Sequence, residues 1–153
     1  MKTLNQWFDE YAESHQNETN QLIHYICVPA IFFSIIGMLM SIPTNFLTNL
    51  FGLNNPYVEN WGTVVLIFLL IFYLRLSFSM FIKMLIFSVI CIVLNYFLGQ
   101  KLPLFYTSLT IFVIAWIGQF YGHKIEGEKP SFFKDLQFLL IGPAWVIKKT
   151  MSK

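Results

Sequence analysis

Four long apolar segments limit this chain to a helical fold inside a membrane. They cover residues 22–42, 58–76, 80–98 and 103–121. Each has about the 17 to 25 residues that a helix needs to cross the hydrocarbon core of a bilayer. Only 12% of the residues are charged, whereas soluble domains carry roughly 25%. Because so little polar surface cannot cover a water-soluble globule, the sequence predicts an all-α membrane protein with four transmembrane helices, folded as a single integral membrane domain over residues 1–153.

An amphipathic stretch precedes the first segment, and a polar loop at residues 43–60 follows it. Near the start of the chain, four apolar side chains recur at helical spacing: Leu4, Trp7, Phe8 and Tyr11. This stripe predicts an amphipathic N-terminal helix, with Thr3 or Asn5 as its cap. We expect this helix to lie on the membrane surface or against the helical bundle.

A fifth apolar stretch, residues 138–147, is too short for a confident span and contains Gly142 and Pro143. It predicts a short interfacial or re-entrant C-terminal helix. The basic residues agree with this prediction. With a cytoplasmic N-terminus and four spans, nine of the ten lysines and arginines lie inside, and Lys101 lies outside. A fifth crossing would reduce this bias to six against four, so we expect both termini in the cytoplasm.

The same topology, which was derived without the histidines, places all three of them at one membrane face. His15 follows the amphipathic helix, His24 begins the first span and His123 ends the fourth. His15 and His24 are nine residues apart, so on one straight helix they would face opposite sides. Residues 17–20 contain three good helix-capping residues and therefore predict a corner that returns His15 towards His24.

Three converging imidazoles are a suitable ligand set for a first-row transition metal such as iron or zinc. We therefore predict that His15, His24 and His123 bind one metal ion. Asn20 lies one helical turn before His24, and Glu126 lies one turn after His123.

Three neighbouring polar side chains are predicted to orient the ligands: Asn20, Gln119 and Glu126. Glu126 is either a fourth ligand or an acceptor for a histidine ring N–H, and we favour the second role. Gly127 is predicted to stop the helix that carries His123.

Other functions lack a matching pattern. The net charge of +2 and the absence of any zinc-finger spacing or RNA-binding signature give no support for nucleic-acid binding. The chain contains no GxSxG, HExxH, P-loop or CxxC motif. Arg75 and Lys83, which flank the short loop between the second and third spans, are either topology signals or a cation for a substrate carboxylate.

Two blocks of the sequence resemble the membrane family of 2-hydroxy fatty acid dioxygenases. They are HQNETNQLIHYICVPAIFFS at residues 15–34 and WIGQFYGHKIEGEKPSFFKDLQFLLIGPAWV at residues 116–146. The matching histidines are His15, His24 and His123. The matching polar signature is Asn20, Gln119, Glu126 and Pro130. The middle spans match the family in hydrophobicity.

The resemblance implies an Fe(II)-dependent enzyme that uses O₂ to shorten 2-hydroxy fatty acids by one carbon, the reaction of α-oxidation. It implies catalytic roles for the three histidines and Glu126, and support of the cofactor by Asn20 and Gln119. A 2-hydroxy fatty acid or related lipid would be the substrate, surrounded by membrane lipids. For a bacterial member, the location would be the inner membrane.

One departure from the family is that a further histidine, present in the middle region of its fungal member, is missing here. Glu126, water or substrate would have to take its place. Two other functions stay open at this point: another metal-dependent lipid enzyme, such as a zinc hydrolase, and a lipid-binding membrane protein without enzyme activity.

Overall fold

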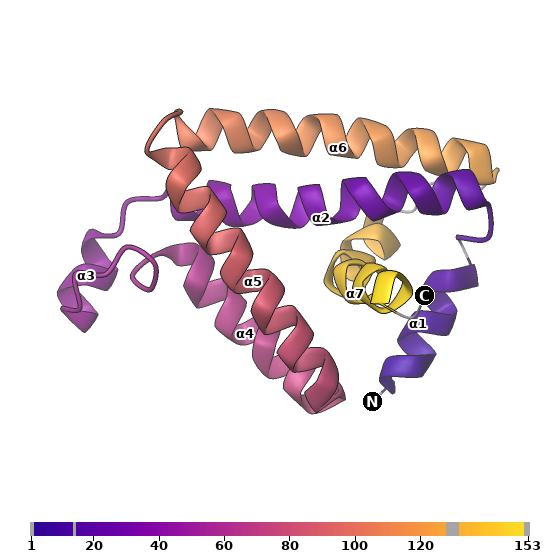
Figure 1. Cartoon of the computed structure of the whole chain (residues 1–153), viewed down its shortest axis with the longest axis horizontal. Helices are drawn as coiled ribbons and strands as arrows, with labels where there is room; N and C mark the ends of the chain where they lie inside the picture. The colour runs from indigo at the N-terminus through magenta and orange to yellow at the C-terminus, as the bar shows by residue number, and fades with distance from the viewer. Residues whose placement is uncertain (1, 14, 128–131, 152–153) are drawn as a thin grey trace. The chain divides into compact units, whose positions relative to one another are not determined.

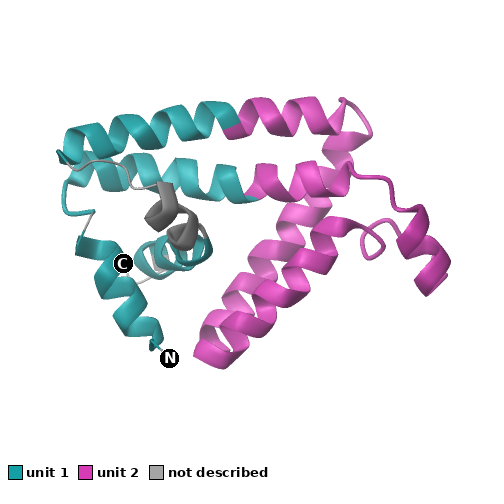
Figure 2. Cartoon of the chain, turned by 180° about the vertical axis from the view of Figure 1, so that it is seen from behind, with its two compact units in different colours: residues 1–32, 113–153 teal, residues 33–112 magenta. Residues whose placement is uncertain are grey.

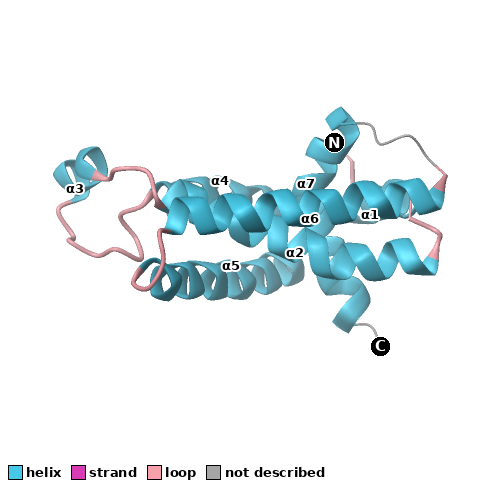
Figure 3. Ribbon diagram, turned by 90° about the horizontal axis from the view of Figure 1, so that it is seen from above, coloured by secondary structure: helices cyan, strands magenta, loops and turns pink. Residues whose placement is uncertain are grey.

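The computed structural model describes residues 2–13, 15–127 and 132–151, and the side chains of all of these except 132–139 and 151. Within these residues every regular element is a helix, as predicted. Figures 1 and 3 show the helices joined by loops. The helices are α1 (Leu4–Glu13), α2 (Glu18–Met40), α3 (Asn45–Phe51), α4 (Trp61–Leu76), α5 (Phe78–Gly99), α6 (Leu104–Glu126) and α7 (Phe132–Met151).

Three of the described helices, α2, α5 and α6, are long and apolar enough to cross a membrane. α4 is apolar but has 16 residues, because it begins at Trp61 rather than at residue 58. The reason is the cap at Asn60, whose side chain accepts a hydrogen bond from the backbone N–H of Thr63 at 2.8 Å. The fold therefore has three strong span candidates and one short one.

The polar loop predicted at residues 43–60 is only partly irregular, because it contains the short helix α3. α3 ends at Gly52, which has a φ of 64°, a left-handed conformation that suits glycine. The carboxylate of Glu59 accepts backbone N–H groups from Leu53 at 2.7 Å and Asn55 at 3.3 Å. Glu59 thus organises the segment that follows α3.

The C-terminal helix is longer than the sequence suggested. α7 has 20 residues, and Pro143 lies inside it. Gly142 does not end the helix but lets it approach α2, since an added Cβ would lie 3.0 Å from Val28 Cγ1. The prediction of a short, broken helix was therefore wrong in length. α7 is not among the described helices that are long and apolar enough to span a membrane.

The chain forms two compact units, which are treated separately (Figure 2). Unit 1 contains residues 1–32 and 113–153, and unit 2 contains residues 33–112. α2 and α6 each continue from one unit into the other. In unit 2, α4 packs against α5, and Ser77 between them caps α5 by accepting a hydrogen bond from Met80 N–H. The predicted metal-site residues all belong to unit 1.

In unit 1, the N-terminal helix α1 lies against α7, as expected for a position against the helical bundle. Thr3 caps α1, because its hydroxyl accepts from Gln6 N–H at 3.3 Å while the Gln6 side chain accepts from Thr3 N–H at 2.8 Å. Tyr11 and Trp145 have ring centroids 5.0 Å apart. The apolar stripe of α1 therefore contributes to the core of unit 1.

Two glycines let α6 approach α2 closely in unit 1. An added Cβ at Gly118 would lie 2.7 Å from Cys27 Sγ, and one at Gly122 would collide with Asn20 Oδ1. They are four residues apart and so share a face of α6, an arrangement that brings membrane helices together. This contact sets His123, the residue after Gly122, beside the first turns of α2.

Candidate metal centre

The three histidines lie together and are buried in unit 1. His15, His24 and His123 are 2%, 1% and 5% exposed. Their ring centroids are 4.3 Å apart for His15 and His24, 5.0 Å for His24 and His123, and 5.5 Å for His15 and His123. One nitrogen from each ring lies within 4.8 Å of the others. The predicted convergence of these side chains is thus present in the structure.

The predicted corner between α1 and α2 brings His15 back to His24. The side chain of Asn17 accepts backbone N–H groups from Thr19 at 2.9 Å and Asn20 at 3.3 Å, so Asn17 caps α2. At the other end of the site, α6 stops at Gly127, as predicted, with a φ of 80°. Both helix ends therefore lie next to the histidine cluster.

Backbone carbonyls fix the protonated nitrogen of two rings. His15 Nδ1 lies 2.7 Å from the carbonyl oxygen of Tyr11, and His24 Nδ1 lies 2.9 Å from that of Asn20. A carbonyl only accepts hydrogen bonds, so each Nδ1 must carry the proton and donate it. In a neutral ring the lone pair is then on Nε2, which is the form of imidazole that binds a metal.

These residues fit a metal ion. His24 Nε2 is buried and has no hydrogen-bond partner among the described residues, which is costly for a polar atom unless it binds a ligand. Two ligand nitrogens on one zinc ion can be at most about 4.2 Å apart, twice a bond of about 2.1 Å. The candidate nitrogens here lie within 4.8 Å of one another, which is close to this limit. Nitrogen ligands of this kind suit iron and zinc alike.

Glu126 ties the corner before α2 to the end of α6. Its carboxylate accepts N–H groups from Gln16 at 2.8 Å, from Asn17 at 3.1 Å and from the Asn20 side chain at 2.8 Å. We expected Glu126 to accept a ring N–H and fix a tautomer. For His15 and His24 that expectation was wrong, because backbone carbonyls already perform this role.

The other two polar residues predicted for the site are also buried in unit 1. Asn20 is fully buried and connects Glu126, through its side chain, with His24, through its carbonyl. Gln119 is 6% exposed and lies one turn before His123 on α6. Pro130, which completes the family signature, lies outside the described residues.

Aromatic rings cover the cluster, and the sequence reasoning did not assign them to the site. The Tyr11 ring stacks on His15 with centroids 4.1 Å apart and planes 6° apart. Trp145 of α7, 2% exposed, has its ring centroid 5.9 Å from that of His15. The spacing of Tyr11, four residues before His15, was the available signal. For Trp145 no such signal was available beyond its place near the end of residues 116–146, the second block that resembles the family.

Burial keeps His15 uncharged at neutral pH. Loss of hydration lowers the pKa of His15 from its ordinary value of 6.5 to about 4. Nearby His123 lowers it as well, while the hydrogen bond to the Tyr11 carbonyl and the charge of Glu126 act in the opposite direction. A proton therefore does not compete with a metal for this ring near pH 7.

The fold and the cluster define an all-helical chain with membrane-spanning candidates and a buried three-histidine site. The chain belongs to the family described as 2-hydroxy-palmitic acid dioxygenase Mpo1-like, whose family model matches residues 1–153. A search of curated proteins and a search of solved structures each returned no match.

We predict that the metal-free protein loses stability as the pH falls from 6.5 to about 4. The folded pKa of His15 is below its ordinary value, so in this range the unfolded chain binds a proton that the folded chain does not. The contribution of His15 to the free energy of unfolding is complete above pH 6.5. It falls by on the order of 3 kcal/mol as the pH decreases to about 4. Unfolding in detergent across this range should be less pH-dependent for His15→Gln. An equal pH dependence in both proteins would contradict the prediction.

Proposed function

We propose that this chain is an Fe(II)-dependent dioxygenase that uses O₂ to shorten 2-hydroxy fatty acids by one carbon, as in α-oxidation. The buried histidine cluster is the observation that most supports this proposal. It occurs in a chain whose family is described as 2-hydroxy-palmitic acid dioxygenase Mpo1-like. Family membership supports this substrate class, and the cluster offers residues able to hold the metal.

His15, His24 and His123 would hold the iron through ring nitrogens. Iron bound there would supply the redox chemistry that a reaction with O₂ requires. The carbonyls of Tyr11 and Asn20 keep a proton on Nδ1 of two rings and leave the opposite nitrogen for the metal. The stacked Tyr11 ring and buried Trp145 keep bulk water from His15.

In this proposal Glu126 is a positioning residue. It holds the backbone next to His15 and the side chain of Asn20, which in turn orients His24. Gln119 and Asn20 support the metal site without being assigned as ligands.

The proposed setting is a bacterial inner membrane, with residues 1–153 acting as one integral membrane domain. α2, α4, α5 and α6 would cross the bilayer, and α7 would lie at its cytoplasmic face. The acyl chain of the substrate would enter the apolar region while its polar head remained near the histidines. The charge bias of the sequence supports this orientation, since nine of ten basic residues then lie inside.

The function is tested by oxygen consumption. The purified chain, loaded anaerobically with Fe(II), should consume O₂ with 2-hydroxyhexadecanoate and release a product one carbon shorter. Hexadecanoate, which lacks the hydroxyl, should give no consumption, and neither should His123→Ala. Lipid turnover with zinc and without O₂ would instead favour a hydrolase. A chain that binds no metal would favour a lipid-binding protein.

Glu126→Gln is expected to weaken metal binding by about 10- to 100-fold, the range typical of groups that orient ligands. The amide keeps an acceptor oxygen but loses the negative charge that holds three N–H groups. His123→Ala should abolish binding. Metal affinity can be measured by competition with a chelator, with Glu10→Gln as the control, because Glu10 of α1 pairs with Lys2 and not with a residue of the site. Equal loss in the Glu126 and His123 variants would make Glu126 a ligand.

The topology predicts a cytoplasmic location for both termini. Reporter fusions that are active on only one side of the membrane should give the cytoplasmic signal at residue 153 and after residue 76, between α4 and α5. A fusion after residue 101, between α5 and α6, serves as the control for the opposite side. A C-terminus outside the cytoplasm would mean that α7 crosses the bilayer.

A further inference from the structure

Two adjoining hollows of unit 1 lead to the histidine cluster. The larger has a volume of about 790 Å³, and the smaller about 540 Å³. Five residues line both of them: Asp9, Ala12, Gln21, Trp145 and Lys149. His15 lines the smaller hollow. A molecule in this space can therefore extend from the edge of the metal centre along α1, α2 and α7.

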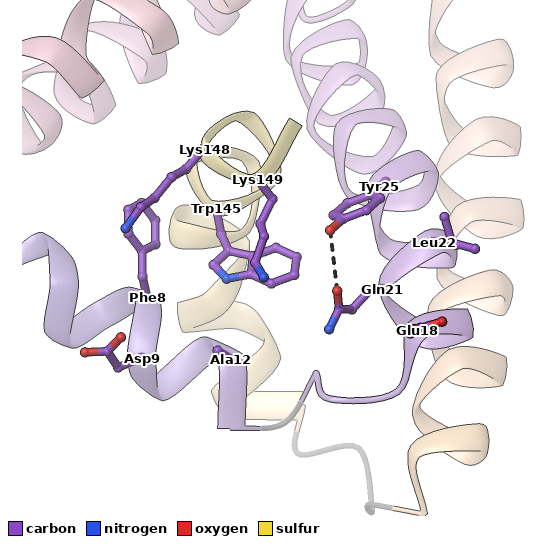
Figure 4. Close-up of a pocket in the computed structure, with 10 residues that line it drawn as sticks. All are labelled: Phe8, Asp9, Ala12, Glu18, Gln21, Leu22, Tyr25, Trp145, Lys148 and Lys149. Atoms are coloured by element: carbon purple, nitrogen blue, oxygen red, sulfur yellow. Dashed lines mark hydrogen bonds between the residues drawn. The ribbon is translucent and has the colours of Figure 1, made fainter. Parts of the chain in front are cut away.

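The walls of both hollows combine polar and apolar side chains. Phe8, Leu22 and Tyr25 line the larger hollow, away from His15. Gln16 and His15 line the smaller one. Gln21 connects the two, because its side-chain amide donates to the His15 carbonyl at 2.7 Å, and Tyr25 OH donates to its oxygen at 3.5 Å (Figure 4). The larger hollow thus offers apolar side chains beside charged ones, and the smaller hollow reaches His15.

Lys149 is the cation that both hollows share. Its ammonium lies 5.5 Å from the centroid of the Trp145 ring, and the same ring lies 5.9 Å from that of His15. Figure 4 shows the ends of Lys149 and Gln21 facing the space between α7 and α2. Lys148 has a different position, since its ammonium lies 4.6 Å from the Phe8 ring and it lines the larger hollow.

Acidic residues also border this space. Asp9 lines both hollows, Glu13 the smaller and Glu18 the larger. Among the described side chains, none of these carboxylates forms an ion pair with Lys149. Figure 4 shows the carboxylate of Asp9 turned away from Trp145 and Lys149. The ammonium of Lys149 therefore remains available to an anionic group that enters beside Trp145.

We propose that the joined hollows receive the head of a 2-hydroxy acid and that Lys149 binds its carboxylate. This inference rests on the proposed function and names a specificity residue for it. Trp145 forms the wall between the ammonium and His15, and the first methylene groups of the acid lie along Phe8 and Tyr25. The pairing selects a free acid over an uncharged amide or ester of the same length.

Binding to the metal-free chain in detergent tests this role without any need for turnover. The two probes are 2-hydroxyhexadecanoate and the uncharged 2-hydroxyhexadecanamide. Lys149→Gln should weaken binding of the acid by about 10-fold, as expected for a lost charge-assisted hydrogen bond, and leave amide binding unchanged. Lys149→Arg should restore the preference for the acid. Lys2→Gln is the matched control, because Lys2 pairs with Glu10 at 2.6 Å and lines neither hollow.

Acid binding by Lys149→Gln that equals that of the unchanged chain would overturn the inference. An equal loss of acid and amide binding would also overturn it, because that result reports a damaged hollow rather than a lost charge. Failure of the proposed function can be distinguished from these two outcomes. If acid binding depends on Lys149 but the iron-loaded chain consumes no O₂, then the carboxylate site stands and the dioxygenase assignment falls.

Discussion

The carboxylate of Glu126 accepts N–H groups from residues that lie between 106 and 110 positions earlier in the chain. Hydrogen bonds to a charged acceptor are stronger than those between neutral groups. Together they fix the corner at Gln16 and Asn17 to the end of α6. Since His15 directly precedes this corner, its ring can meet that of His123 only when the corner is held.

A second constraint acts at the same place, because the glycine at position 122 removes a side chain where α6 meets α2. A Cβ there would collide with Asn20 Oδ1 and lie 3.4 Å from His24 Cε1. Asn20 is also the residue that holds Glu126 and whose carbonyl orients His24. One asparagine therefore links the approach of the two helices to the direction of a ligand ring. A metal bound by these histidines would therefore be coupled to helix packing, because binding energy at such a site adds to folding energy.

The sequence predicted the parts of this arrangement that depend on local pattern. Apolar length predicted α2, α5 and α6, capping residues predicted the corner, and Gly127 predicted the end of α6. The meeting of the histidines followed from topology. Contacts between distant segments could not be predicted from local sequence pattern. The partners of Glu126 and the position of Trp145 depend on how α6 and α7 pack, and no local periodicity encodes that. α4 was placed too early because its apolar run hid the cap at Asn60.

A cation for the substrate carboxylate likewise depends on contacts between distant segments. The sequence offered Arg75 and Lys83 as this cation, since they flank a short loop at the expected cytoplasmic face. Lys149 was counted as a topology signal, and the structure sets it on the walls that lead to His15. The two roles are compatible, because a lysine at a membrane interface lies at the depth where a fatty acid carries its carboxylate. Helix α7 therefore brings two kinds of group to the site: the aromatic ring of Trp145 against His15, and an ammonium one turn further on. Because Trp145 and Lys149 are four residues apart, they share one face of α7, and a tilt of this helix would move both together.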